Sequence, residues 1–115
     1  MLTPFERGLI AHLIADWLLQ NDWMARNKMN LTHPASWVHS GIQALALTLA
    51  LGWQAGLVLG VIHLLIDTRI PLQWWKHFFR QTVEGPAALH VAIWGDQVLH
   101  IVAIAVWVAL FPSLT

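Results

Sequence analysis

Histidine and aspartate recur four residues apart in three apolar segments of this chain. The pairs are His12/Asp16, His63/Asp67 and, in reverse order, Asp96/His100. Residues four apart lie on one face of a helix, so each pair would point its imidazole and its carboxylate in the same direction. A fourth apolar segment carries a single imidazole, His39. The spacing therefore indicates one shared polar site that several helices build together.

Imidazole and carboxylate without cysteine form a ligand set that suits Zn²⁺, Mn²⁺ or Fe²⁺, and this chain has no cysteine. We expect a divalent ion, with zinc ranked above manganese and iron. The predicted ligands are His12, Asp16, His39, His63, Asp67, Asp96 and His100. Seven candidates exceed the four ligands of a single tetrahedral zinc ion. Either two ions are bound, or some of the aspartates orient histidines instead of binding metal.

A metal in such a site could lower the pKa of bound water to about 7 and polarise a carbonyl or phosphoryl oxygen. Asp16, Asp67 and Asp96 are the predicted catalytic groups, because an unligated carboxylate can serve as general base. One hypothesis is thus a metal-dependent hydrolase acting on a lipophilic or lipid-linked substrate from the cytoplasmic side. The alternative is a non-enzymatic protein whose polar network is a proton or ion path, or a clamp between helices. The sequence leaves open whether the protein is an enzyme.

The composition is that of an integral membrane protein. Hydrophobic residues make up 57 % of the 115 residues and charged residues only 10 %, and the mean hydropathy is +0.59. Soluble domains usually carry about 25 % charged residues, so this chain lacks the charged surface that they need. Six basic and six acidic residues balance, and nothing in this charge indicates nucleic acid as a partner. Membrane lipid is the expected partner.

The pattern predicts an all-α, four-helix transmembrane bundle as a single domain over residues 1–115. The predicted membrane-spanning helices cover residues 4–20, 34–51, 55–70 and 87–111. Thr3–Glu6 reads as a capping box at the start of the first helix, and Pro71 is expected to end the third. In residues 72–80 the apolar side chains and the polar side chains each recur at three- and four-residue spacing. They predict a short amphipathic helix on the membrane surface.

Five of the six Lys and Arg residues lie in or beside the loops 21–33 and 71–86. The positive-inside rule places these loops in the cytoplasm and both termini outside. A homodimer is compatible with the sequence, because four short helices bury little surface.

Other polar residues have simpler explanations. His33 precedes a proline at a helix start and is expected to cap that helix, while His77 and His90 are expected outside the site. Three glutamines lie near the candidate ligands and could orient them by hydrogen bonds. They are Gln20, Gln43 and Gln97.

Four stretches of the chain resemble a known family. They are HLIADWLLQNDWMARNK (His12–Lys28), the lone His39, HLLIDTRI (His63–Ile70) and DQVLH (Asp96–His100). In this order they resemble the short bacterial and phage membrane proteins grouped as domain of unknown function 3307, over nearly the whole chain. The resemblance implies a multi-pass protein of the bacterial cytoplasmic membrane with no established activity. It marks His12, Asp16, Gln20, Asp22, Trp23, Asn27, Lys28, His39, His63, Asp67, Asp96, Gln97 and His100. More loosely, the pattern is similar to membrane-bound metal-dependent hydrolases.

Overall fold

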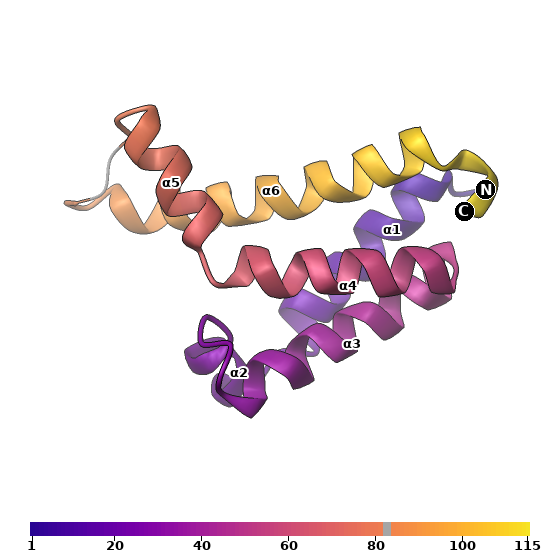
Figure 1. The fold of residues 1–115 in the computed structure, drawn as a ribbon, viewed down its shortest axis with the longest axis horizontal. Helices are drawn as coiled ribbons and strands as arrows, with labels where there is room; N and C mark the ends of the chain where they lie inside the picture. The colour runs from indigo at the N-terminus through magenta and orange to yellow at the C-terminus, as the bar shows by residue number, and fades with distance from the viewer. Residues whose placement is uncertain (82–83) are drawn as a thin grey trace.

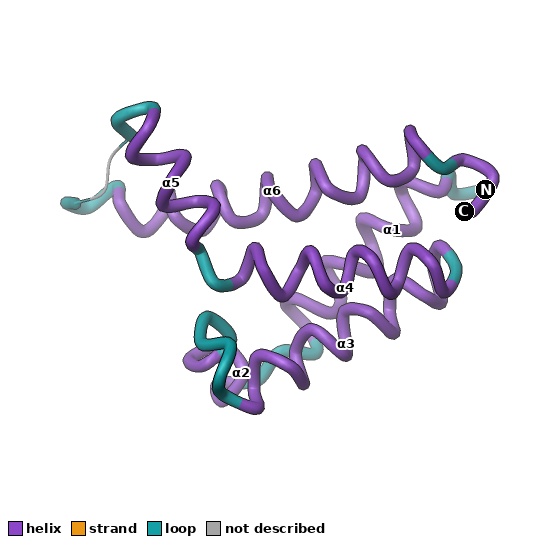
Figure 2. The backbone as a smooth tube through the Cα atoms, in the orientation of Figure 1, coloured by secondary structure: helices purple, strands orange, loops and turns teal. Residues whose placement is uncertain are grey.

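Every regular element of the computed structural model is a helix, over the residues that it describes, 1–81 and 84–115 (Figure 2). In chain order the elements are α1 (Pro4–Leu13), the π-helical turn η1 (Ile14–Leu18), α2 (Asp22–Asn27), α3 (Pro34–Leu51), α4 (Trp53–Asp67), α5 (Ile70–Phe78), α6 (Ala88–Leu110) and η2 (Pro112–Leu114). The predicted all-α class is confirmed. Residues 82–83, which fall in the predicted loop 71–86, lie outside the described residues.

The first predicted helix, residues 4–20, is divided into two parts. It ends as an α-helix at Leu13 and continues as the π-helical turn, in which the Leu19 amide N–H donates to the Ile14 carbonyl at 3.0 Å. A π-turn widens the helix by one residue and occurs frequently at functional sites. In this chain the turn carries Asp16 and buries it.

The stretch predicted as the loop 21–33 contains the short helix α2. Asn21 caps this helix, because its side-chain oxygen accepts a hydrogen bond from the Met24 amide at 2.9 Å. The chain then turns inward at Lys28, which is only 9 % exposed. A segment that composition assigns to the surface therefore contributes a cation to the interior.

The third predicted membrane span and the predicted surface helix differ from the structure at their ends. The helix predicted over 55–70 is α4, which ends earlier, at Asp67, and Pro71 opens α5 instead of ending α4. Proline fits the first turn of a helix, because the amide hydrogen that it lacks would have no helical partner there. Between α4 and α5, Arg69 has φ +62° and the helix direction changes by 60°. The surface helix predicted over 72–80 is α5, shifted two residues toward the N-terminus.

Helices α3 and α4 form an antiparallel hairpin that packs through small residues (Figure 1). A Cβ atom added at Gly60 would lie 2.7 Å from the Cβ of Ala44, and one added at Gly56 would meet the Thr48 side chain. Gly52 makes the connection with φ +100°, a conformation that glycine adopts without steric cost. Small residues at four-residue intervals allow close approach of helix backbones and are typical of helix pairs in membranes.

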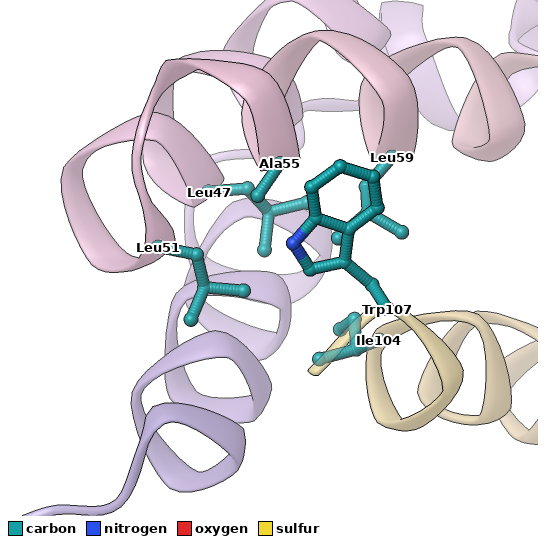
Figure 3. Packing of buried hydrophobic residues seen from close by; sticks show 6 residues of the cluster. All are labelled: Leu47, Leu51, Ala55, Leu59, Ile104 and Trp107. Atoms are coloured by element: carbon teal, nitrogen blue, oxygen red, sulfur yellow. The ribbon is translucent and has the colours of Figure 1, made fainter. Parts of the chain in front are cut away.

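The interior has an apolar half and a polar half. The apolar half lies between α3, α4 and α6, at the end of the bundle where both termini lie (Figures 1 and 3). It consists of Leu47, Leu51, Ala55, Leu59, Ile104 and Trp107. Over the described residues, the buried set contains twelve hydrophobic and twelve polar or charged residues. Large apolar side chains meanwhile lie on the surface, such as Leu49, which is 82 % exposed. Buried polar and charged residues are far more frequent here than in water-soluble proteins, which seldom bury Asp or Lys unless they are paired.

Among residues 1–81 and 84–115, α6 alone is long and apolar enough to cross a membrane as a single helix. It has 23 residues, or about 35 Å at 1.5 Å per residue, against a hydrocarbon layer of about 30 Å. Helices α4 and α5 pass the same test only when they are counted together as one bent span. The predicted four spans therefore stay a prediction for the rest of the bundle.

Candidate metal centre

Six buried side chains converge in the polar half of the interior, and we name them the His/Asp cluster. They are Asp16 on η1, His39 on α3, His63 and Asp67 on α4, and Asp96 and His100 on α6. Each is at most 3 % exposed. The four-residue spacing on α4 and α6 thus places both members of each pair in the same interior, as predicted.

Asp67 lies at the centre of the cluster. Its Oδ2 atom is 2.9 Å from Nε2 of His63 and 3.3 Å from Nε2 of His39. Its Oδ1 atom forms a hydrogen bond of 3.0 Å with Nε2 of His100. Asp16 approaches from the other side, with Oδ1 3.0 Å from Nε2 of His39. Three imidazoles therefore turn the same ring nitrogen toward two carboxylates.

Four of these residues could hold one ion. One ligand atom from each of Asp16, His39, His63 and Asp67 lies within 4.8 Å of all the others. Ligands bound tetrahedrally at zinc distances are about 3.4 Å apart. The four separations between an imidazole nitrogen and a carboxylate oxygen in this group run from 2.9 to 4.0 Å and bracket that value. The four side chains thus fit around a single tetrahedral ion.

The closest contact in this group is not aligned as a hydrogen bond. His63 Nε2 and Asp67 Oδ2 are 2.9 Å apart, yet both atoms are buried without a hydrogen-bond partner in the described part of the chain. Two ligands of one ion have this arrangement, because each lone pair points to the ion and not to the other ligand. Leaving a buried polar atom unsatisfied costs about 1–3 kcal/mol, and a bound cation would remove that cost for both atoms.

A second group shares one residue with the first. It consists of Asp67, Asp96 and His100, whose ligand atoms also lie within 4.8 Å of one another. His100 Nε2 is 3.0 Å from Asp67 Oδ1 and 3.9 Å from Asp96 Oδ2. Because Asp67 belongs to both groups, its two oxygens could bridge two ions, as in two-metal sites where the ions are about 3.5–4 Å apart. The geometry accommodates one ion or two.

His12 is buried beside the cluster, but neither of the two groups formed by the described residues includes it. Its Nε2 atom forms a hydrogen bond of 3.0 Å with Gln97 Oε1, and its Nδ1 atom bonds the side-chain amide of Gln43. The Gln97 amide in turn donates to Asp16 Oδ2 at 2.6 Å. His12, predicted as a metal ligand, thus contacts the glutamines and lies 4.0 Å from the Asp16 carboxylate. Gln43 and Gln97 thus make hydrogen bonds of the expected kind, whereas the Gln20 Oε1 atom has no hydrogen-bond partner among the described residues.

Lys28 belongs to the site, although its position in a predicted loop left it out of the candidate set. Its Nζ atom is 3.7 Å from Asp16 Oδ1 and 3.9 Å from Asp67 Oδ1. These distances are longer than hydrogen bonds, so the ammonium group balances the charge of both carboxylates without occupying their ligand positions. The only sequence signal for it was the family resemblance, which marks Lys28 together with the ligands.

A cavity of about 180 Å³ lies at the edge of the cluster. Its polar lining consists of Asp16, Gln20, Lys28, Arg69, Asp96 and Gln97. Asp96 is notable among them, because its Oδ1 atom is buried with no hydrogen-bond partner among the described residues. The cavity is therefore the place where a small molecule could meet the cluster.

The remaining histidines lie outside the cluster, as predicted. His33 caps α3, with Nδ1 accepting a hydrogen bond from the Ala35 amide at 3.1 Å. His77 on α5 and His90 on α6 are exposed.

Fold and site together define a small all-helical protein with a buried His/Asp centre that could bind metal. The chain belongs to the family described as "Protein of unknown function (DUF3307)", whose model matches residues 5–115. Neither the curated proteins nor the solved structures compared with the chain gave a match. The looser similarity to membrane-bound hydrolases stays a prediction. Because the family name carries no activity, the function has to be argued from the site.

Proposed function

We propose that this protein is a membrane-embedded metal-binding protein, and more specifically a metal-dependent hydrolase for a lipophilic or lipid-linked substrate. The observation that carries metal binding is the contact between His63 and Asp67, 2.9 Å long and without hydrogen-bond alignment. His39 and Asp16 complete a four-ligand set, which is the number that zinc takes in proteins. Manganese and iron accept the same ligand types.

The surface supports a membrane location. Apolar side chains cover the outside of the long helices while charged groups lie inside, as expected where lipid is the solvent. Both termini lie at one end of the bundle, and α2 and α5 lie at the other (Figure 1). The positive-inside rule assigns the end with α2 and α5 to the cytoplasm. The cavity is lined by Lys28 and Arg69, so access to the centre is from that side. A homodimer stays a prediction.

In a hydrolase of this design, the chain's own groups have separate tasks. A divalent ion, when bound, supplies an acidified water and polarises the oxygen under attack. Asp16 and Asp67 would be ligands of this ion, and Gln97 holds the Asp16 carboxylate in place by donating a 2.6 Å hydrogen bond to it. Asp96 lines the cavity and has one carboxylate oxygen, Oδ1, without a hydrogen-bond partner among the described residues, so its carboxylate can accept the proton of a water molecule.

The alternative function is a structural clamp or a proton path, and two contacts favour it. Lys28 balances the charge of Asp16 and Asp67, and hydrogen bonds through Gln97 join α1, η1 and α6. A clamp needs no metal, so the two functions differ in metal content.

Elemental mass spectrometry of detergent-purified protein, prepared without chelators, tests metal binding. We expect one or two equivalents of zinc, manganese or iron in the unchanged protein and in the matched control His77→Ala, and none in His63→Ala. A chelator should lower the unfolding temperature of the first two proteins and leave that of His63→Ala unchanged. Absence of metal from all three, with no stabilisation by added zinc, would contradict metal binding and favour the clamp.

The hydrolase assignment needs a separate test. Asp96→Asn should keep the ion held by Asp16, His39, His63 and Asp67 and lose hydrolysis of phosphate or acyl esters in detergent, because Asp96 lines the cavity. Activity that survives this change with the metal in place would overturn the role of Asp96 as base.

A further inference from the structure

Arg69 lines the 180 Å³ cavity, and no carboxylate of the described residues lies within 4.0 Å of its guanidinium group. Its Nε atom is buried, and within the described residues that atom has no hydrogen-bond partner. The side chain as a whole is only partly buried, but a buried N–H donor without an acceptor still costs free energy, which a ligand oxygen would recover. The second cation of the lining, Lys28, differs in that it has Asp16 and Asp67 within 4.0 Å.

The backbone at Arg69 makes its position more informative. Its φ of +62° lies in the left-handed region, which glycine and asparagine adopt more readily than other residues. The 60° bend between α4 and α5 needs this backbone conformation, but it does not need an arginine. Strained residues other than glycine are concentrated at functional sites. The turn therefore does not account for an arginine at this position, which indicates that the guanidinium group has a function of its own.

The metal site changes the charge of the cavity, and this step rests on the proposed function. Three aspartates and two cations lie around the cavity and cluster, and these alone leave one negative charge. One divalent ion reverses the sign and leaves one positive charge. Because Asp16 and Asp67 would then bind the ion, Lys28 would lose its only anionic neighbours within 4.0 Å among the described residues.

We propose that this cavity binds the phosphate group of the substrate, with Arg69 as the principal contact and Lys28 as the second cation. A guanidinium group matches phosphate with two parallel hydrogen bonds. The cavity is smaller than the roughly 300–1,000 Å³ of pockets for drug-sized ligands, so it holds a small charged group and leaves the rest of the molecule outside. Trp17 and Ile93, which also line the cavity, offer apolar surface to that remainder. The phosphate can belong to a soluble molecule or to a lipid headgroup.

Calorimetric titration of the full-length, metal-loaded protein in detergent tests this site, with inorganic phosphate and dodecyl phosphate as probes. We expect both probes to bind. Arg69→Gln should weaken binding about tenfold or more, because hydrogen bonds to a charged group are lost, and Lys28→Met should weaken it less. Arg69→Gly removes the guanidinium group and suits the left-handed backbone, so it serves if Arg69→Gln does not fold. Arg26→Gln is the matched control, since Arg26 is exposed on α2, and it should leave binding unchanged.

The two probes identify the source of the phosphate. At least tenfold tighter binding of dodecyl phosphate supports a lipid headgroup, and equal affinities support a soluble phosphate. The site is overturned if neither probe binds, or if Arg69→Gln and Arg69→Gly bind as tightly as Arg26→Gln. Metal content measured on the same samples separates the two proposals. Stoichiometric metal without phosphate binding contradicts only the phosphate site, and Arg69-dependent binding without metal contradicts only the metal site.

Discussion

The same three helices, α3, α4 and α6, line both halves of the interior, yet the halves differ in chemistry, and Asp16 of η1 and Lys28 complete the polar one. Each helix carries a stripe of buried residues at four-residue steps that changes from polar to apolar along its length. The stripes are His39, Gln43, Leu47 and Leu51 on α3, Asp67, His63, Leu59 and Ala55 on α4, and Asp96, His100 and Ile104 on α6. At the termini the stripes form the apolar half (Figure 3), and at the end with α2 and α5 they form the His/Asp cluster.

The contrast indicates that the two halves contribute differently, one to the stability of the fold and the other to binding. Burying charged and polar groups costs free energy unless they find partners, and several atoms of the cluster lack hydrogen-bond partners in the described residues. The apolar half shows no such cost apart from the Trp107 indole nitrogen. We infer that close packing in the apolar half stabilises a fold whose polar half is arranged for binding. The predictions below test whether the halves can be changed separately.

The largest effect is expected where both halves depend on one contact, the approach of α3 to α4. In Gly56→Val the new side chain would overlap Thr48, and its Cβ atom would lie 2.7 Å from the Ala44 carbonyl oxygen. The helices must separate, so we expect loss of folded protein and of metal together. The measurement is the yield of monodisperse protein by size-exclusion chromatography, with metal content.

Gly41→Ala on the facing helix is the matched control, because a Cβ atom there has no neighbour within 4 Å among the described residues. Alanine favours helix over glycine by about 0.5–1 kcal/mol, so this variant should be as stable as the unchanged protein or slightly more so. A folded, metal-loaded Gly56→Val protein would show that the close approach of α3 and α4 is not required.

A smaller effect should be confined to the apolar half. Leu47 is 1 % exposed, and Leu47→Ala should lower the free energy of unfolding by about 3 kcal/mol, because it leaves a cavity in a packed core. Metal content per folded molecule should not change. Leu49→Ala on the same helix is the control, since Leu49 is 82 % exposed and an exposed substitution is worth about 0.5 kcal/mol or less. Denaturant unfolding in detergent gives both values. If metal is lost from Leu47→Ala, the halves are not separable.

Local rules were sufficient to predict much of this molecule. Pro34 and Gly52 mark the ends of α3 as the sequence indicated, and the capping box of Thr3 and Glu6 forms with hydrogen bonds of 2.8 and 3.2 Å. The four-residue spacing correctly brought His63 with Asp67 and Asp96 with His100 into one buried cluster, but of the pair His12/Asp16 only Asp16 joins that cluster. These predictions depend only on side chains near each other in sequence.

The features that could not be predicted depend on tertiary packing. The π-helical turn that buries Asp16 has no signal in the sequence, because its residues fit the same helical periodicity as α1. Burial of Lys28 follows from the turn after α2, a helix of six residues that is too short to be stable alone. Pro71 can either end one helix or open another, and only the bend at Arg69 decides between these outcomes. From their charge alone, Lys28 and Arg69 would be expected on the surface, yet both line the cavity.

The smallest effect should separate two kinds of histidine inside the polar half. His63 presents an unpartnered Nε2 atom to the candidate metal position, whereas both ring nitrogens of His12 are hydrogen-bonded, to Gln97 and Gln43. His12→Ala should therefore lower metal occupancy less than about threefold, or roughly 0.6 kcal/mol, while His63→Ala abolishes it. Metal content per folded molecule, measured on both variants in parallel, decides the point. Complete loss of metal from His12→Ala would mean that His12 exchanges its glutamine partners for the ion, and that all seven predicted ligands act together.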